Sequence, residues 1–377
     1  MSEELSLYLH FPFCRSKCIY CDFNSRPLRD GEELNAYLAA LAGEVRRQAM
    51  PARRVVSIYL GGGTPSLLGA GQLAALLEEV RRSFAVDRAA EITLEANPGT
   101  VSGEAARAWA DLGVNRVSLG VQAFQDRLLA LLGRAHGVRE VASSVEALRR
   151  AGIANLNLDL IYQLPGQSLE DWRESLRRAV VLAPEHLSAY PLQVEKGTPL
   201  AALVRRGLGL PSEEEGLRME QELVETARRA GLERYEIANF ARPGCQCRHN
   251  RRYWERLDYL GLGAGAHSCI GERRFWNVRS PDVYTRRAAA GKSPRGGGER
   301  LSPGTRRSEV AILGLRLTEG LSLAAFRERC GMELEQAFPG VTRRLGAVGL
   351  AVCRDGRLRL SRRGLSLANR AFVEFLP

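Results

Sequence analysis

The strongest constraint on the fold is a regular alternation of two kinds of segment in the first half of the chain. Short apolar segments rich in β-branched or aromatic residues alternate with longer segments whose apolar residues recur at helical spacing. Strands that alternate with helices form parallel βαβ units wound in one direction. The pattern predicts an α/β fold, built either as a parallel barrel or as an open doubly wound sheet. The predicted strands are residues 5–10, 55–60, 92–95, 117–121, 156–161 and 186–191, and the predicted helices are residues 34–48, 72–83, 104–112, 139–151 and 169–182.

Polar or glycine residues follow almost every predicted strand. In a parallel barrel the carboxyl ends of the strands form the face on which active sites are built. The residues at these strand ends are therefore candidates for ligand binding. They are the run Gly61-Gly62-Gly63-Thr64, Glu95, Gln122 and Asp159.

The pattern changes after residue 210. Ser212 and the glutamates that follow it predict a capped helix over residues 211–231. Residues 235–240 have the composition of a strand, and the glycine- and proline-rich residues 291–304 indicate a linker.

The last part of the chain is predicted to be a small separate module. Residues 305–377 are mostly helical, but Asp355-Gly356 favours a tight two-residue turn between two short strands in residues 350–360. Helices followed by a small hairpin make a winged-helix-like module. The predicted domains are residues 1–210 for the core, 211–295 for an extension of it, and 305–377 for the C-terminal module.

Charge is unevenly distributed along the 377 residues. The chain has 54 basic and 43 acidic residues, and residues 270–377 carry 21 of the basic and 10 of the acidic ones. This excess of 11 equals the net charge of the whole chain. An anionic partner is therefore expected at the C-terminal third, and nucleic acid, an anionic membrane face and an acidic protein all remain open. The preference for arginine over lysine is equally explained by codon bias.

The N-terminus and hydropathy predict a cytoplasmic protein. No segment approaches the roughly 20 apolar residues that span a bilayer. The first residues, Met1-Ser2-Glu3-Glu4, lack the basic and then apolar order of a signal peptide.

Three cysteines directly after the first predicted strand carry the most specific chemical signal. Cys14, Cys18 and Cys21 have the spacing C-x3-C-x2-C. Three thiolates on one loop can bind three irons of a [4Fe–4S] cluster and leave the fourth iron open. Zinc is the alternative, but a compact zinc site usually has a fourth Cys or His nearby, and residue 23 is Phe.

A second group of chemically active residues occupies residues 245–254. The sequence Cys-Gln-Cys-Arg-His-Asn-Arg-Arg-Tyr-Trp offers His249 and Tyr253 as axial haem ligands, arginines for propionates and aromatic rings for the macrocycle. A zinc or auxiliary-cluster site and a purely structural loop remain open from the residues alone.

The motifs in combination resemble a known family. They are Tyr8-x-His10-x-Pro12-Phe13-Cys14, Cys18-x-Tyr20-Cys21, Gly61-Gly62-Gly63-Thr64-Pro65-Ser66, Glu95-Ala96-Asn97-Pro98, Gly120-Val121-Gln122, Arg134-Ala135-His136, Asn157-Leu158-Asp159-Leu160-Ile161-Tyr162, His186-Leu187-Ser188 and residues 261–268. This set is similar to the radical S-adenosylmethionine (SAM) superfamily, and more closely to its oxygen-independent coproporphyrinogen oxidase-like (HemN-like) branch. The likeness covers nearly the whole chain.

The resemblance implies a partial (β/α)6 barrel that holds a [4Fe–4S] cluster and SAM at the strand ends. Cys14, Cys18 and Cys21 then bind the cluster. By the family pattern, the residues around SAM are Tyr8, Tyr20, Gly62, Gly63, Thr64, Glu95, Gln122, Arg134, Asp159, Gln193 and His267. One departure concerns Gln163, where relatives usually carry glycine; a positive φ there would strain the turn next to Asp159.

Within this branch, His249-Asn250-x-x-Tyr253 resembles the HNxxY motif of the haem chaperone (HemW) subgroup. The resemblance implies that His249 and Tyr253 hold haem, which is passed intact to acceptor haemoproteins, including respiratory enzymes. True oxidases of the branch carry a further cysteine two residues after the third cluster ligand, where this chain has Phe23. They also have a longer segment before the cluster, whereas 13 residues precede Cys14 here.

Three functions follow from these observations. The leading prediction is a haem chaperone that carries a cluster and SAM, acts in the cytoplasm with peripheral membrane contact through its basic module, and is a monomer or a SAM-dependent dimer. The second is oxidative decarboxylation of coproporphyrinogen III. The third, an RNA-modifying enzyme, is suggested by the basic tail and its hairpin, but the tail lacks an aromatic and basic recognition motif.

Overall fold

A single curved sheet organises most of the molecule. The computed structural model describes residues 3–376. Its largest sheet has the strand order β14-β13-β12-β11-β1-β4-β5-β6-β7-β8-β10-β9. These strands are β1 (Glu4–Phe11), β4 (Met50–Gly62), β5 (Phe84–Ala96), β6 (Arg116–Gln122), β7 (Asn155–Tyr162), β8 (His186–Pro191), β9 (Glu233–Arg234), β10 (Asn239–Ala241), β11 (Tyr259–Leu262), β12 (His267–Ile270), β13 (Arg273–Asn277) and β14 (Arg295–Arg300).

The six predicted strands form the parallel centre of this sheet, as β1 and β4 to β8. β11 extends it by pairing in parallel with β1, and β12, β13 and β14 follow in antiparallel order. The prediction of a parallel α/β fold is confirmed. The sheet ends at β14 on one side and β9 on the other, so it is a partial barrel rather than a closed one.

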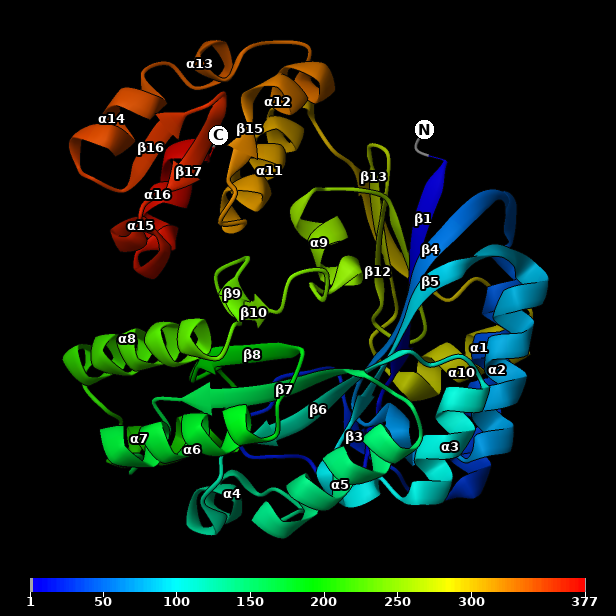
Figure 1. Cartoon of the computed structure of the whole chain (residues 1–377). Helices are drawn as coiled ribbons and strands as arrows, with labels where there is room; N and C mark the ends of the chain where they lie inside the picture. Colours follow the sequence, from blue (N-terminus) through cyan, green and yellow to red (C-terminus); the bar gives the residue numbers. More distant parts are fainter. Residues whose placement is uncertain (1–2, 377) are drawn as a thin grey trace.

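Helices cover the outer, convex face of the parallel strands (Figure 1). α1 illustrates why. Its N-cap is Asp30, whose side chain accepts a hydrogen bond from the backbone N–H of Glu33. Its apolar face buries Leu34, Tyr37 and Leu41 against the sheet. The helices up to β11 are α1 (Gly31–Arg47), α2 (Ala70–Ser83), α3 (Gly103–Asp111), α4 (Asp126–Leu132), α5 (Val138–Arg150), α6 (Leu169–Val181), α7 (Pro199–Arg205), α8 (Glu213–Arg229) and α9 (Arg248–Trp254); α10 (Pro281–Ala289) follows β13.

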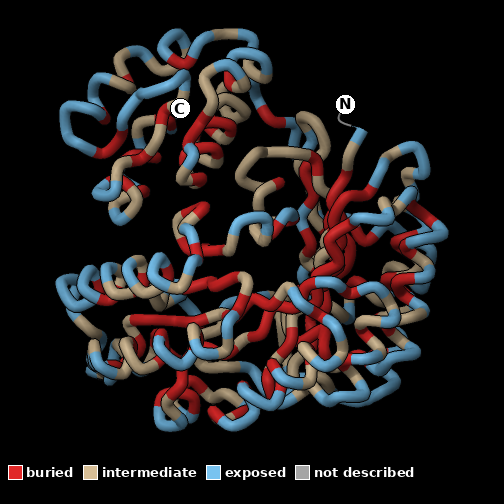
Figure 2. The backbone as a smooth tube through the Cα atoms, in the orientation of Figure 1, coloured by how far each residue is buried: buried red, intermediate tan, exposed pale blue. Residues whose placement is uncertain are grey.

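The inner, concave face of the sheet is polar. Along β1, Leu5, Leu7 and Leu9 point towards the helices, whereas Ser6 and Tyr8 alternate with them and point inward. Buried residues follow the strands, and exposed ones follow the outer helices (Figure 2). A barrel without a ligand cavity is filled by branched apolar side chains. Here the interior, which we call the lumen, is instead lined by Tyr59, Glu95, Arg116, Ser118, Asn157, Asp159 and Ser188.

The C-terminal module has its own hydrophobic core and a small sheet in the order β15-β17-β16. Asp355 and Gly356 both adopt positive φ, 51° and 69°, between β16 and β17, which confirms the predicted hairpin turn. The elements are α11 (Pro303–Arg316), β15 (Leu321–Ser322), α12 (Leu323–Cys330), α13 (Leu334–Ala337), α14 (Val341–Ala347), β16 (Ala351–Arg354), β17 (Arg357–Leu360), α15 (Arg362–Ser366) and α16 (Ala368–Phe372).

Two predictions about local structure were wrong. The linker predicted over residues 291–304 contains β14, whose Gly297 lies against the ring of Trp276 in β13, where a side chain would collide. The strand predicted over residues 235–240 is interrupted between β9 and β10. There the carboxylate of Glu236 accepts hydrogen bonds from the backbone N–H of Ala238 and from the side-chain amide of Asn239. The prediction of the Ser212-capped helix is confirmed as α8.

The strain expected at Gln163 is present and is accommodated by a glycine in α8. Gln163 has a φ of 62°, in the left-handed region that disfavours residues with a Cβ. Its side chain lies directly over Gly216: a Cβ added there would be 1.9 Å from Gln163 Nε2. The two residues therefore depend on each other.

We expect this dependence to appear in a double-mutant cycle. Gln163→Gly should raise the free energy of unfolding by about 1 kcal/mol, because the left-handed strain is removed. Gly216→Ala should stabilise the Gln163→Gly chain by about 1 kcal/mol through helix propensity, and should stabilise the parent chain by less, because there the Gln163 side chain must first move away. Urea unfolding of the four chains measures this; equal effects of Gly216→Ala in both backgrounds would contradict it.

Candidate functional site

A large cavity opens at the carboxyl ends of the parallel strands and extends into the lumen. We call it the first pocket; its volume is about 500 Å³. It brings together most of the predicted ligand residues, from segments far apart in the chain. Those that line it are Cys14, Cys18, Tyr20, Cys21, Gly62, Gly63, Thr64, Glu95, Gln122, Arg134, Asp159 and Gln193. The remaining two predicted SAM residues, Tyr8 and His267, line a different pocket.

The glycine run after β4 forms one wall of the first pocket by pairing with the segment that leads to the cysteines. The backbone N–H of Gly63 donates to Phe11 O at 2.6 Å, and that of Thr64 donates to Phe13 O at 2.8 Å. A Cβ at Gly63 would be 2.4 Å from Phe13 O, so only glycine permits this approach. The run therefore fixes the cysteine-bearing loop against the sheet.

The three cysteines lie on the loop between β1 and α1, and burial raises the pKa of the Cys21 thiol. Within residues 3–376, no three His, Cys, Asp or Glu side chains are grouped so that they could hold one metal ion. In an iron–sulfur cluster each thiolate binds a different iron, so the donor sulfurs surround a volume rather than a point. Three thiols that line one wall of a pocket would suit such a cluster as its ligands.

Two half-buried carboxyl groups face the first pocket. Glu95 accepts hydrogen bonds from the Tyr59 hydroxyl at 2.8 Å and from the Gly62 backbone N–H at 2.9 Å. Burial raises the pKa of Glu95 to about 7. Asp159 accepts from Ser118 Oγ and Asn157 Nδ2, each at 2.8 Å, and burial raises its pKa as well. Such groups suit the ammonium and hydroxyls of a polar ligand.

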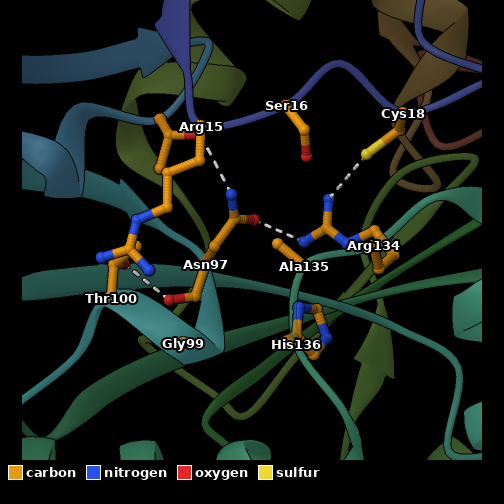
Figure 3. A pocket seen from close by; sticks show the side chains of 10 residues that line it. Arg15, Ser16, Cys18, Asn97, Gly99, Thr100, Arg134, Ala135 and His136 are labelled. Carbon is orange, nitrogen blue, oxygen red and sulfur yellow. Dashed lines mark hydrogen bonds between the residues drawn. The ribbon is translucent and has the colours of Figure 1, made fainter. Parts of the chain in front are cut away.

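Arg134 connects the cysteine loop to the sheet (Figure 3). Its guanidinium donates to Gly120 O at 2.6 Å, to Asn97 Oδ1, and to Cys18 Sγ at 3.6 Å. The residues in Figure 3 line a small cavity of about 30 Å³ beside this loop. Arg134 is therefore held next to one predicted cluster ligand.

The backbone conformation of Gln122 is not evident from the sequence. It has a φ of 70°, at a register shift between β6 and β7. Such bulges redirect side chains and occur next to ligand sites. In this conformation Gln122 lies in the wall of the first pocket.

A second pocket of about 360 Å³ adjoins the first, because Gly62, Glu95 and Phe23 line both. Its walls are rich in aromatic rings. Phe23 is 62% exposed at this junction. The full lining is Tyr8, His10, Phe23, Asn24, Gly62, Glu95, Tyr253, Tyr259, Gly265, Ala266 and His267.

The HNxxY segment forms α9, which closes the lumen from the side opposite the cysteines. His249 is only 1% exposed. Its Nδ1 is 3.0 Å from Ser57 Oγ, and its Nε2 is 2.9 Å from the hydroxyl of Tyr253. Burial lowers the pKa of His249 to about 3, so the ring is neutral. Iron binding by His249 therefore requires at least one of these hydrogen bonds to break.

Glu91 in β5 holds the start of α9 and was not identified from the sequence. Its carboxylate accepts from the backbone N–H groups of Arg248 and His249, at 3.0 and 3.1 Å. The thiol of Cys247 donates to it at 3.5 Å. No local motif marks this residue, since its partners lie more than 150 positions away.

The C-terminal module contacts the other side of α9. Arg251 pairs with Glu319, before β15, at 2.7 Å. The guanidinium of Arg316 in α11 lies 4.3 Å from the ring centre of Trp254. α9 is thus enclosed between the lumen and the module, as the ribbon shows (Figure 1).

Comparisons with known proteins agree with this architecture. A family model described as the radical SAM superfamily matches residues 8–179, and one described as the HemN C-terminal domain matches residues 301–367. The solved structure of coproporphyrinogen III oxidase (HemN) from Escherichia coli superposes with a TM-score of 0.87 and 25% identity, over 98% of this chain and 89% of that chain. The fold and the cysteine-bearing pocket thus define a radical SAM scaffold of the HemN type.

Sequence relatives are more specific. The protein named heme chaperone HemW from Mycobacterium tuberculosis is 40% identical, over 97% of this chain and 93% of its own length. The one from Bacillus subtilis is 36% identical, over 98% and 99%. The chain therefore belongs to the HemW family.

No helix within residues 3–376 is both long and apolar enough to cross a membrane.

Proposed function

We propose that the protein binds haem and passes it intact to acceptor haemoproteins, with a [4Fe–4S] cluster and SAM in its first pocket. The observation that carries the proposal is the second pocket, where Tyr253 of the HNxxY segment joins other aromatic rings beside the cysteine-bearing pocket. Flat aromatic walls suit a porphyrin, since stacked rings bury large apolar areas. The names of the curated relatives support the same function.

The residues of the first pocket suit the cluster and SAM. Cys14, Cys18 and Cys21 would bind three irons, and the open fourth iron would take the amino and carboxylate groups of SAM. Glu95 would accept hydrogen bonds from the N–H groups of the iron-bound amino group, and Asp159 from the ribose hydroxyls. A reduced cluster with SAM bound to it would supply a route to radical chemistry. We assign Tyr20, Gly62, Gly63, Thr64, Gln122, Arg134 and Gln193 to the same site, and Tyr8 to its border with the second pocket.

The acceptor is proposed to dock on the basic C-terminal third. Residues 270–377 hold the net positive charge, which favours an acidic protein surface or an anionic membrane face. Membrane-bound respiratory enzymes would present both an acidic protein surface and an anionic membrane face. We retain the division into residues 1–210, 211–295 and 305–377, a cytoplasmic site of action, and a monomer or SAM-dependent dimer as parts of this proposal.

The test is an anaerobic haem titration of the cluster-reconstituted protein. Stoichiometric binding with a defined Soret band is expected. Absence of binding would reject the proposed function. The HemN-like structure keeps coproporphyrinogen III decarboxylation as the second candidate, and formation of protoporphyrinogen in an anaerobic assay would favour that candidate over ours.

The raised pKa of Glu95 predicts that SAM binds more tightly at higher pH. With a pKa of about 7, Glu95 is mostly neutral at pH 6 and mostly ionised at pH 8, and only the ionised form makes charge-assisted hydrogen bonds to the N–H groups of the amino group. The ionised fraction rises from about 0.1 to about 0.9, so the affinity should rise roughly tenfold. Calorimetry at both pH values measures this. Glu95→Gln should bind weakly at both; an unchanged pH dependence in that variant would assign the effect to another group.

A further inference from the structure

His267 differs from the other imidazoles of the lumen in being accessible. It is the first residue of β12 and is exposed, and it lines the second pocket together with Tyr253. Within the described chain, neither of its ring nitrogens has a hydrogen-bond or ion-pair partner. His249, in contrast, uses both nitrogens and is buried.

The surroundings hold the His267 ring in a defined orientation. It stacks on the indole of Trp276, with ring centres 5.7 Å apart and planes 25° apart, because the two residues face each other across β12 and β13. The glycine-rich turn between β11 and β12 brings the ring to the pocket wall. A fixed imidazole with unengaged nitrogens is the usual protein donor to haem iron.

The charges near His267 suit a haem as well. Partial desolvation in the pocket wall, with the neighbouring Arg274 and Arg279, lowers the pKa of His267, which favours the neutral form of the ring that binds metals. The guanidinium of Arg279 is exposed and makes no ion pair among residues 3–376, so it remains available for a propionate. Phe23 supplies an exposed ring at the junction of the pockets, on which a macrocycle can stack.

We propose that the second pocket is the haem site and that His267, rather than the buried His249, is the imidazole that binds the haem iron. This rests on the proposed function. It moves His267 from the predicted SAM set to the haem site. Tyr253 remains at the same site through its place in the pocket wall, while His249 positions Tyr253 through the hydrogen bond between them.

The experiment compares full-length, cluster-reconstituted chains in anaerobic titrations with haem, followed by Soret absorption and electron paramagnetic resonance. His267→Ala should bind haem about tenfold more weakly or worse, because one iron ligand is lost. His267→Met should still bind haem but with a shifted Soret band and altered resonance, since a thioether replaces the imidazole. Unchanged cluster content shows that both variants fold; this is expected, because the side chain is exposed.

His249→Phe is the matched comparison, because it removes the other imidazole of the region and keeps a ring of similar size. It should alter the affinity, through Tyr253, but leave the spectrum of the bound haem unchanged. A wild-type spectrum in His267→Met, together with a changed one in His249→Phe, would overturn the assignment while leaving haem binding established. Absence of haem binding by the parent chain would instead reject the proposed function.

Discussion

Replacement of Cys14, Cys18 or Cys21 by alanine, one at a time, is expected to abolish the iron–sulfur cluster. In the proposed site each thiolate binds a different iron, so a chain with two thiolates should not retain a cube that already has one open corner. Iron and sulfide content and visible absorption after anaerobic reconstitution measure the effect. SAM binding should fall with it, because the open iron is one of its attachment points.

Cys353→Ala is the matched control. Cys353 is an exposed thiol in β16 of the C-terminal module, far from the first pocket in the fold. It should reconstitute as fully as the parent chain. Full iron and sulfide in a Cys18→Ala chain would show that the cluster has other ligands. Zinc content above iron in the parent would support the alternative of a zinc site.

Glu91→Ala is expected to have the largest effect on stability among single changes in the lumen. Two backbone N–H groups of α9 donate to this carboxylate, and hydrogen bonds to a charged group are each worth about 1.5–3 kcal/mol. The loss should reach about 3 kcal/mol or more, because Glu91 is buried and water cannot replace it fully. Denaturant unfolding measures this, and proteolysis near residues 245–255 should become faster.

Glu140→Ala provides the comparison. Glu140 also accepts from a backbone N–H at the start of a helix, that of Gly137 before α5, but it is exposed. Its loss should cost about 1 kcal/mol or less. Similar costs for the two variants would mean that Glu91 contributes only as an ordinary cap, and that α9 is held by other contacts.

The sequence predicted features that depend on neighbours in the chain. Strand and helix alternation, the cap at Ser212 and the turn at Asp355-Gly356 are local, and all are present in the structure. The cysteines and the glycine run also lie together as expected, because each directly follows a strand of one parallel sheet.

Features set by distant partners could not be predicted. The motif predicts His249 as an iron ligand, but its Nδ1 is engaged by Ser57 Oγ, which lies 192 positions away. The glycine- and proline-rich residues 291–304 predicted a linker, whereas Gly297 in β14 accommodates the ring of Trp276. The separation of Tyr8 and His267 from the other predicted SAM residues depends on how β11 and β12 extend the sheet beyond β1.

The open sheet has a mechanical consequence. A closed barrel has a radius fixed by its strand number and shear, and it can widen only by breaking a row of backbone hydrogen bonds. Here the row of strands ends at β14 and β9, which do not pair with each other. A small increase in twist between neighbouring strands can therefore enlarge the interior while every ladder stays intact. A rigid, bulky cargo could enter and leave such a container at little energetic cost to the scaffold.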